Sequence, residues 1–207
     1  MQTKECVAVL TGAGSGIGRA LASALAQSGC HLALADVNAA ALAETAAQVR
    51  ALGVRVSEHT LDVADRSAVA ALPDAVIAAH GQVDLLINNA GVALGGTFDQ
   101  VSVENFDWLM RINFDAVVTM CRAFLPLLRQ RPEARIVNLS SLFGLITPAG
   151  QTAYCASKFA LHGFSDALRA ELAPTGIDVM LCSPSTTSSE FFDHARQRGG
   201  SFREVNL

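Results

Sequence analysis

Tyr154 and Lys158 are the side chains in this sequence with the clearest potential for chemistry. Tyr154 is the only tyrosine, and Lys158 follows it at a spacing that puts both on one face of a helix. An ammonium about 4 Å from a phenolate stabilises it by roughly 4 kcal/mol at an effective dielectric constant of about 20. That energy lowers a phenol pKa by about three, from about 10 towards neutrality. The pair predicts a tyrosine that exchanges protons with a substrate; a solvated helix face is the alternative.

The glycine-rich segment from Thr11 to Gly18 predicts a dinucleotide-binding loop. It follows an apolar run and precedes an expected helix, as such loops do. Glycines allow a tight turn and a close approach to a pyrophosphate, and the helix N-terminus favours the negative charge. An ordinary tight turn is the other interpretation. The expected cofactor contacts here are Gly12, Ser15, Gly16, Ile17 and Gly18.

Asp36 ends the second apolar run, about 20 residues after the glycine-rich loop. A carboxylate at this place accepts hydrogen bonds from the ribose hydroxyls of the cofactor and repels a 2′-phosphate. Neither Val37 nor Ser15 adds a basic group that would hold that phosphate. The sequence therefore favours NAD over NADP, unless Asp36 only caps the helix that starts near Asn38.

Polar residues also follow the third and fourth apolar runs. Asp62 and Val63 follow the third run, and Asn88-Asn89-Ala90-Gly91 follows the fourth. Ligands bind at the carboxyl ends of strands in open α/β sheets, so Asp62, Val63, Asn89, Ala90 and Gly91 are predicted cofactor contacts. These side chains could instead satisfy loose backbone groups, and we expect Asn89 to do so in part.

Short apolar runs alternate with longer helical stretches along the whole chain. Runs rich in Val, Ile and Leu are typical of parallel strands buried on both faces. A repeating strand–helix order predicts an α/β fold, a doubly wound, Rossmann-like parallel sheet in one domain spanning residues 1–207. The predicted strands are residues 7–10, 32–35, 54–57, 85–87, 135–139 and 179–182, and the predicted helices are 17–28, 39–52, 67–80, 103–129 and 154–173.

Taken together, these motifs resemble those of the short-chain dehydrogenase/reductase family. The resemblance implies that Tyr154 is the general acid/base, and that Lys158 lowers its pKa and binds the nicotinamide ribose. It implies that Ser141 bonds the substrate oxygen and that Asn113 supports a water-linked proton relay. Otherwise Ser141 is a strand-end turn residue and Asn113 a helix-interior polar group. Tyr154, Lys158 and Pro184 are further expected cofactor contacts.

The sequence departs from the family pattern in two places. Pro184-Ser185 stands where the family usually has Pro-Gly, and Ser189 stands where a cofactor-contacting threonine is common. Ser185 adopts positive φ less readily than glycine, so a shifted loop is expected. The sequence ends at Leu207, where the family continues, so either the sequence shown is incomplete or this member lacks the family's last strand and part of its substrate wall. In the second case the sixth strand would be an exposed edge unless it is paired or covered.

Composition and charge exclude several classes of protein. Hydrophobic residues make up 51% and charged residues 16%, which argues against disorder. The net charge of −4 gives no basic footprint for nucleic acid. No apolar stretch reaches the ~20 residues of a membrane span, and no signal peptide opens the chain, so a cytoplasmic location is expected. The five cysteines lack C-x-x-C spacing, so neither disulfides nor a metal site is expected.

We expect an oxidoreductase that transfers a hydride between NAD(H) and a hydrophobic secondary alcohol or ketone. The alternative is a weak or inactive NAD-binding regulatory or scaffolding protein. A sugar-nucleotide epimerase or dehydratase is disfavoured because the G-x-x-G-x-x-G loop is absent. The family resemblance implies a homodimer or homotetramer built through the two long helices. The predicted substrate wall is apolar and comprises Val92, Leu94, Phe98, Phe143, Leu145, Ile146, Phe191 and Phe192.

Overall fold

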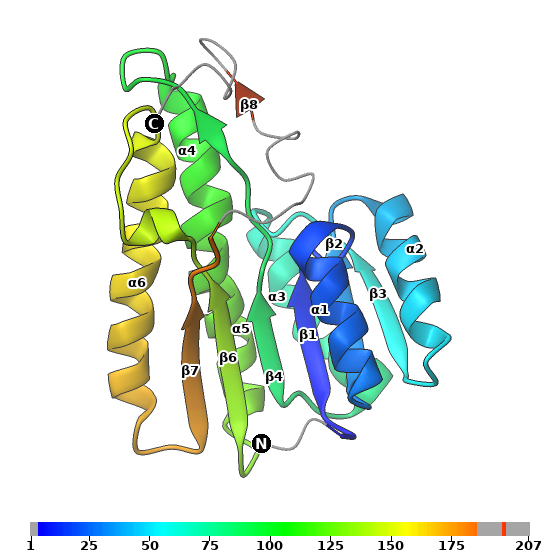
Figure 1. The fold of residues 1–207 in the computed structure, drawn as a ribbon. Helices are drawn as coiled ribbons and strands as arrows, with labels where there is room; N and C mark the ends of the chain where they lie inside the picture. The colour runs from blue at the N-terminus through cyan, green and yellow to red at the C-terminus, as the bar shows by residue number, and fades with distance from the viewer. Residues whose placement is uncertain (1–3, 186–195, 198–207) are drawn as a thin grey trace.

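Six parallel strands form the main sheet, in the order β3-β2-β1-β4-β6-β7. The computed structural model describes residues 4–185 and 196–197 (Figure 1). The sheet is the predicted doubly wound, Rossmann-like arrangement, and the predicted fold class is confirmed. The strands are β1 (Val7–Thr11), β2 (His31–Asp36), β3 (Val56–Thr60), β4 (Leu85–Asn88), β6 (Ala134–Leu139) and β7 (Ile177–Cys182), and a short separate pair joins β5 (Leu94–Gly95) to β8 (Arg196–Gln197).

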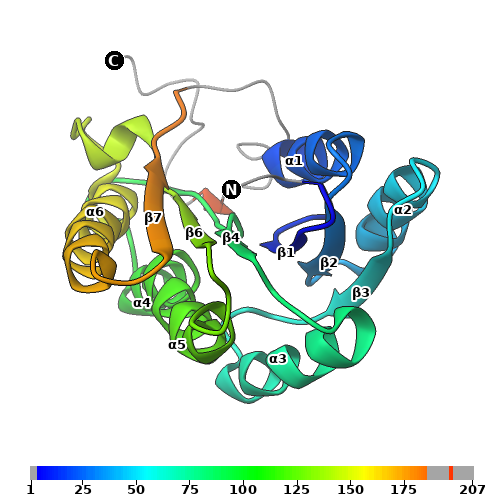
Figure 2. The same cartoon turned by 90° about the horizontal axis from the view of Figure 1, so that it is seen from below.

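Helices cover both faces of the sheet, as Figure 2 shows. The first two helices lie over one face, and the others lie over the opposite face. Within the described residues, no helix combines the length and the apolar composition that crossing a bilayer requires. The helices are α1 (Gly16–Gln27), α2 (Ala39–Arg50), α3 (Arg66–His80), α4 (Val103–Met110), α5 (Ala116–Leu128) and α6 (Thr152–Leu172).

Each face of the sheet has its own hydrophobic core. On one face, Ala22 of α1 and Leu42 of α2 pack against strand residues such as Leu32, and the buried Cys6 and Cys30 join this core as small side chains. On the other face, α3, α5 and α6 bury a larger cluster that is centred on bulky residues such as Phe124 of α5. Because strand side chains alternate between faces, the continuous apolar runs supply both cores.

The strand order reverses between β1 and β4, which lie next to each other in the sheet. The connection from β1 leads through α1 to β2 on one side, while β4 pairs with β6 on the other side. The loops that follow β1 and β4 therefore separate and leave a crevice at the carboxyl edge of the sheet. This edge is the arrowhead end of the strands in Figure 1.

The third strand lies later in the chain than predicted. It was expected at residues 54–57, but β3 spans Val56–Thr60 and pairs with β2 from Leu32↔Val56 to Asp36↔Thr60. β3 is an edge strand, so its sequence VSEHT is mostly polar and partly exposed. The apolar pattern favoured Val54, whereas hydrogen bonding to β2 determines the strand.

The long helix predicted at residues 103–129 contains an irregular segment. Helix α4 ends at Met110, a π-helical segment spans Arg111–Asp115, and α5 begins at Ala116. A π-helical turn accommodates an extra residue and is frequent at functional sites. The segment contains Asn113, a predicted site residue. Ser102 is the N-cap of α4, and its side chain accepts a hydrogen bond from the main-chain N–H of Asn105.

Candidate active site

A cavity of about 330 Å³ lies at the carboxyl edge of the sheet, at the reversal of strand order. Loops that follow β1, β2, β3, β4, β6 and β7 all contribute residues to its wall. Among the described residues, Asn113 is the only predicted catalytic or cofactor-binding residue that does not line it. The predicted residues that do line it are Gly12, Ser15, Gly16, Ile17, Gly18, Asp36, Asp62, Val63, Asn89, Ala90, Gly91, Ser141, Tyr154, Lys158 and Pro184.

The N-terminus of α1 is suited to bind an anion. Ser15 is the N-cap residue, its side chain makes no capping hydrogen bond, and the first turn contains no acidic residue. The first main-chain N–H groups of a helix lack intrahelical partners and carry partial positive charge. Gly16 and Ile17 belong to this first turn and line the cavity. A pyrophosphate therefore fits the unfilled donors at this end.

Gly18 keeps the glycine-rich loop tightly packed against the rest of the site. A Cβ atom at Gly18 would lie 1.9 Å from the carbonyl oxygen of Gly12 and 2.7 Å from the side-chain nitrogen of Asn89. Asn89 in turn donates from Nδ2 to the carbonyl oxygens of Thr11 and Gly12, at 3.0 and 3.1 Å. Asn89 therefore holds the loop after β1, as the sequence analysis expected in part.

The Asp36 carboxylate binds two main-chain groups and still faces the cavity. Its Oδ2 accepts from the N–H of Gly14 at 2.8 Å, and its Oδ1 accepts from the N–H of Asn38 at 2.9 Å. A carboxylate offers about four acceptor positions, so ribose hydroxyls can use those that remain. The helix cap itself is Asn38, whose side chain accepts from the N–H of Ala41. Helix capping alone therefore does not explain why the Asp36 side chain lies at the cavity.

Tyr154 and Ser141 meet on the opposite wall of the cavity. Tyr154 lies in the first turn of α6 and is 6% exposed, with its ring edge-on to Phe143. Ser141 follows β6, and its Oγ accepts from the N–H of Phe143 at 3.2 Å. Burial raises the pKa of Tyr154, and a hydrogen bond with Ser141 partly opposes that increase. The two hydroxyls are thus adjacent, and the phenol is neutral at neutral pH.

Lys158 is buried one helical turn after Tyr154. Its Nζ donates to the carbonyl oxygen of Leu139 at 2.9 Å and lies 5.6 Å from the centre of the Tyr154 ring. Burial lowers the pKa of Lys158 to about 8. Lys158 was expected to lower the pKa of Tyr154, but the pKa of Tyr154 is raised instead. Desolvation acts on both groups and favours their neutral forms, so it outweighs the expected stabilisation of the phenolate.

Asn113 lies behind the cavity wall, in the π-helical segment. Its Oδ1 accepts from the N–H of Val92 at 2.8 Å, and its Nδ2 donates to the carbonyl oxygen of Val92 at 2.9 Å. The same Nδ2 is 3.3 Å from the Oγ of Ser157, which donates to the carbonyl oxygen of Tyr154 at 2.8 Å. Asn113 therefore links the loop after β4 to α6, the helix that carries Tyr154.

The apolar wall is smaller than predicted. Val92 and Phe143 line the cavity, whereas Leu94 is buried in a core cluster with Leu109 and Tyr154. Phe98, Leu145 and Ile146 do not line the cavity and are 73%, 59% and 48% exposed. Phe191, Phe192 and Ser189 lie outside the described residues.

Seven further residues line the wall and were not predicted as contacts, because most of them are apolar and belong to no motif: Val37, Leu61, Ala93, Ile112, Leu139, Ser140 and Leu142. Pro184 and Ser185 both line the cavity, and Glu5 is the only described non-glycine residue with positive φ. Ser185 therefore does not adopt the positive φ that glycine would favour.

Within the described residues, no group of three or more His, Cys, Asp or Glu could hold a metal ion.

We predict that Lys158→Met raises the stability of the protein while it removes catalysis. The pKa of Lys158 falls from 10.5 to about 8 on folding, so the buried charge costs about 3 kcal/mol below pH 8. The carbonyl of Leu139 loses a donor, which offsets about 1 kcal/mol of the gain. Chemical denaturation at pH 7 should show a net gain of about 2 kcal/mol in the free energy of unfolding.

The pH dependence of the free energy of unfolding tests the same effect of Lys158 in a second way. Between pH 8 and 10.5 the unfolded chain binds more protons at Lys158 than the folded protein, so stability should rise with pH in that window. Lys158→Met should remove this rise. Lys4, the only other lysine, is exposed, and Lys4→Met is the matched control that should keep it. A Lys158→Met protein less stable than wild type at pH 7 would contradict the prediction.

Comparison with known proteins establishes the family. The sequence model described as short chain dehydrogenase matches residues 6–199. The oxidoreductase SadH of Mycobacterium tuberculosis is 43% identical over 207 residues, which cover 90% of this chain and 75% of SadH. This chain belongs to the short-chain dehydrogenase/reductase family, and it is an enzyme of the dehydrogenase/reductase class.

Two solved structures show the same fold with a bound nucleotide. A short-chain dehydrogenase/reductase from Burkholderia phymatum in complex with NAD has a TM-score of 0.91 and 37% identity, covering 94% of this chain and 70% of that one. An NAD⁺-bound xylitol dehydrogenase has a TM-score of 0.86 and 32% identity, covering 89% and 72%. Together with the anion-binding end of the cavity, these structures support a nicotinamide dinucleotide as the cofactor.

Proposed function

We propose that this protein transfers a hydride between NAD(H) and an apolar secondary alcohol or ketone, with Tyr154 as the general acid and base. The observation that carries the proposal is that one cavity is lined both by the glycine-rich loop and by Ser141, Tyr154 and Lys158. A carbonyl oxygen between the two hydroxyls would have two hydrogen-bond donors. The bound dinucleotide supplies or accepts the hydride.

In the direction of reduction, Tyr154 donates the proton that neutralises the oxygen as negative charge develops on it. The neutral phenol is the form required, and burial of Tyr154 favours that form. Ser141 holds the reacting oxygen in place. In oxidation the steps run in reverse: Tyr154 first passes on its own proton, and the phenolate that results accepts the proton of the alcohol.

Lys158 fits the next position in a proton path. Its pKa of about 8 allows its ammonium to lose or regain a proton near neutral pH. We propose that Lys158 also binds the nicotinamide ribose. Asn113 would anchor the inner end of the relay, because its hydrogen bonds to Val92 and Ser157 fix its carboxamide beside α6.

NAD is the proposed dinucleotide, in preference to NADP. Asp36 would accept the ribose hydroxyls and repel a phosphate on the same ribose. Within the described chain, Lys158 is the only basic residue that lines the cavity, and it belongs to the opposite, catalytic end. Two similar proteins, the short-chain dehydrogenase/reductase from Burkholderia phymatum and a xylitol dehydrogenase, were both solved with NAD, and they support the same preference.

A substrate panel with NAD and NADP in parallel tests the proposal. The panel contains apolar secondary alcohols, the matching ketones and polyols, because a similar structure is a xylitol dehydrogenase. We expect turnover with the apolar compounds and a kcat/KM about 100-fold higher with NAD than with NADP. Equal use of both cofactors, or activity confined to polyols, would contradict the proposal. Tight NAD binding without any turnover would favour the regulatory or scaffolding alternative.

A further inference from the structure

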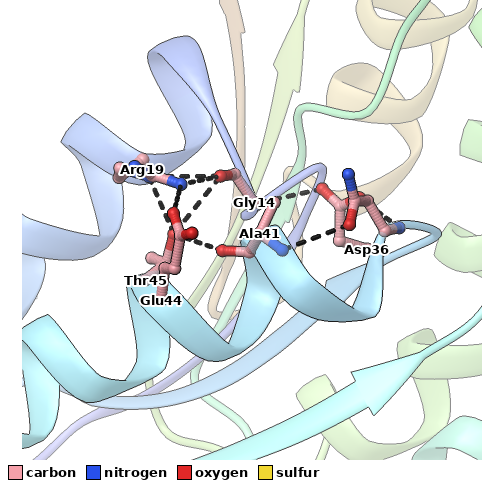
Figure 3. Close-up of polar contacts among 7 residues, drawn as sticks. Gly14, Arg19, Asp36, Ala41, Glu44 and Thr45 are labelled. Atoms are coloured by element: carbon pink, nitrogen blue, oxygen red, sulfur yellow. Dashed lines mark hydrogen bonds and ion pairs between the residues drawn. The ribbon is translucent and has the colours of Figure 1, made fainter.

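The main-chain N–H and the main-chain carbonyl of Gly14, in the glycine-rich loop, are both held by side chains (Figure 3). Its N–H donates to Oδ2 of Asp36 at 2.8 Å. Its carbonyl oxygen accepts from Nη2 of Arg19 at 2.6 Å and from Nε of Arg19 at 3.1 Å. The Thr45 hydroxyl is a further donor to the same oxygen, at 3.4 Å. The backbone of one residue, Gly14, therefore connects the Asp36 carboxylate to residues of α1 and α2, through the two peptide groups that flank its Cα atom.

The donors to this carbonyl are themselves well fixed. Thr45 is fully buried, and its Oγ1 also contacts the carbonyl oxygen of Ala41 at 3.2 Å. Nε of Arg19 is 3.1 Å from Oγ1 of Thr45, and Nη2 of Arg19 is 3.1 Å from Oε2 of Glu44. The Arg19 guanidinium therefore bonds to Gly14, Thr45 and Glu44, as Figure 3 shows.

The contact between Gly14 and Asp36 leaves no free space. A Cβ atom at Gly14 would lie 3.0 Å from Cγ and Oδ2 of Asp36 and 3.1 Å from Cβ of Ala41. A displacement of the Gly14 backbone would therefore disturb the Asp36 carboxylate packed against it. Because Asn38 binds Oδ1, the carboxylate is held by both of its oxygens.

We propose that Arg19 and Thr45 are positioning residues for dinucleotide selectivity. By holding the Gly14 carbonyl they fix the orientation of the Asp36 carboxylate, and so they set how strongly the site prefers NAD to NADP. This inference rests on the proposed function. Without Arg19, the Gly14 backbone loses its shortest anchor, the hydrogen bond from its N–H to Asp36 loosens, and the Asp36 carboxylate can rotate away from a 2′-phosphate. The preference for NAD should then decrease although Asp36 itself is unchanged.

Calorimetric titration of NAD and of NADP into each variant tests this inference without any turnover. Arg19→Met should lower the ratio of the two dissociation constants, NADP over NAD, by about tenfold, as the loss of a charge-assisted hydrogen bond implies. Thr45→Val should lower it by about threefold, and Thr45→Ser should restore it because the hydroxyl is retained. Arg19→Lys keeps the charge but loses the fork of donors, so it should give an intermediate ratio.

Arg50→Met is the matched control. Arg50 is an arginine of α2 that pairs with Glu58 at 2.7 Å and donates to the carbonyl oxygen of Val56, away from the cavity. Its replacement should leave the ratio unchanged. Arg19→Met in an Asp36→Ala background should also leave the ratio of that background unchanged, because the two residues act through one path. Thermal unfolding without nucleotide verifies that each variant is folded.

The outcomes separate the inference from the function on which it rests. A wild-type protein that binds NADP as tightly as NAD would overturn the proposed cofactor preference and the inference with it. A wild type that prefers NAD, with an unchanged ratio in Arg19→Met, would overturn the positioning role alone. Equal weakening of both dinucleotides in Arg19→Met would likewise assign Arg19 to loop stability and contradict the inference.

Discussion

Replacing Tyr154 by Phe is expected to reduce kcat by about a thousandfold, because it removes the hydroxyl that we propose gives the proton to the reacting oxygen. Loss of one hydrogen bond from the phenol should weaken NAD binding by at most about tenfold. The fold should be retained, since the ring of Tyr154 packs edge-on against Phe143 and Phe preserves that contact. Steady-state kinetics and calorimetric NAD titration of the same preparation measure both effects.

Cys155→Ala is the matched control for this variant. Cys155 adjoins Tyr154 on α6 and is also buried, and burial raises the pKa of its thiol, so the thiolate is disfavoured. Its Sγ lies 3.8 Å from the carbonyl oxygen of Ile146. We expect kcat of Cys155→Ala to stay within about threefold of wild type. A Tyr154→Phe enzyme that keeps a tenth of its kcat, or a Cys155→Ala enzyme that loses it, would contradict the assignment.

Gly18→Ala should have the largest effect on cofactor binding of any single methyl addition in the loop. The new Cβ would be 1.9 Å from the carbonyl oxygen of Gly12 and 2.7 Å from the Asn89 side chain. The backbone of the loop would have to shift by more than an ångström, moving its N–H groups away from the pyrophosphate. We expect a loss of about 3 kcal/mol in the free energy of unfolding. NAD affinity should fall by about 100-fold, measured by calorimetry on protein that remains folded.

Gly163→Ala is the control for the added methyl group. Gly163 lies within α6, and a Cβ there would meet no atom within 4 Å. Alanine is the better helix former by about 1 kcal/mol, so this variant should be as stable as wild type or more stable, with unchanged NAD affinity. If Gly18→Ala bound NAD like Gly163→Ala, the close packing of the loop would have no role in holding the cofactor.

Parallel strands that are buried on both faces could be found from sequence because their apolar residues are continuous. β1 and β4 illustrate this, since every residue of both strands is buried. β3 was displaced by two residues at its start because an edge strand is defined by pairing with β2, and its own residues are mixed. The π-helical segment at Arg111–Asp115 was missed because the hydrogen bonds of Asn113 to Val92 are long-range contacts.

Most of the cavity could be predicted because its residues follow strand ends or belong to short motifs. The pKa of Tyr154 could not, because helical spacing gives the proximity of Lys158 but not the burial of both groups. The contacts of Arg19 and Thr45 with the Gly14 carbonyl could not be predicted from the sequence either. They join residues of α1 and α2 through a main-chain carbonyl, which carries no side-chain signal.

The most direct test of the account follows one labelled hydrogen. Wild-type protein and Tyr154→Phe are incubated with NAD and the preferred secondary alcohol, deuterated at the carbon that bears the hydroxyl. Mass spectrometry then reads the reduced dinucleotide. We expect wild type to form NADH that carries the deuterium, and Tyr154→Phe to form about a thousandfold less of this labelled NADH in the same time. Unlabelled NADH from wild type, or equal yields from both proteins, would contradict this expectation.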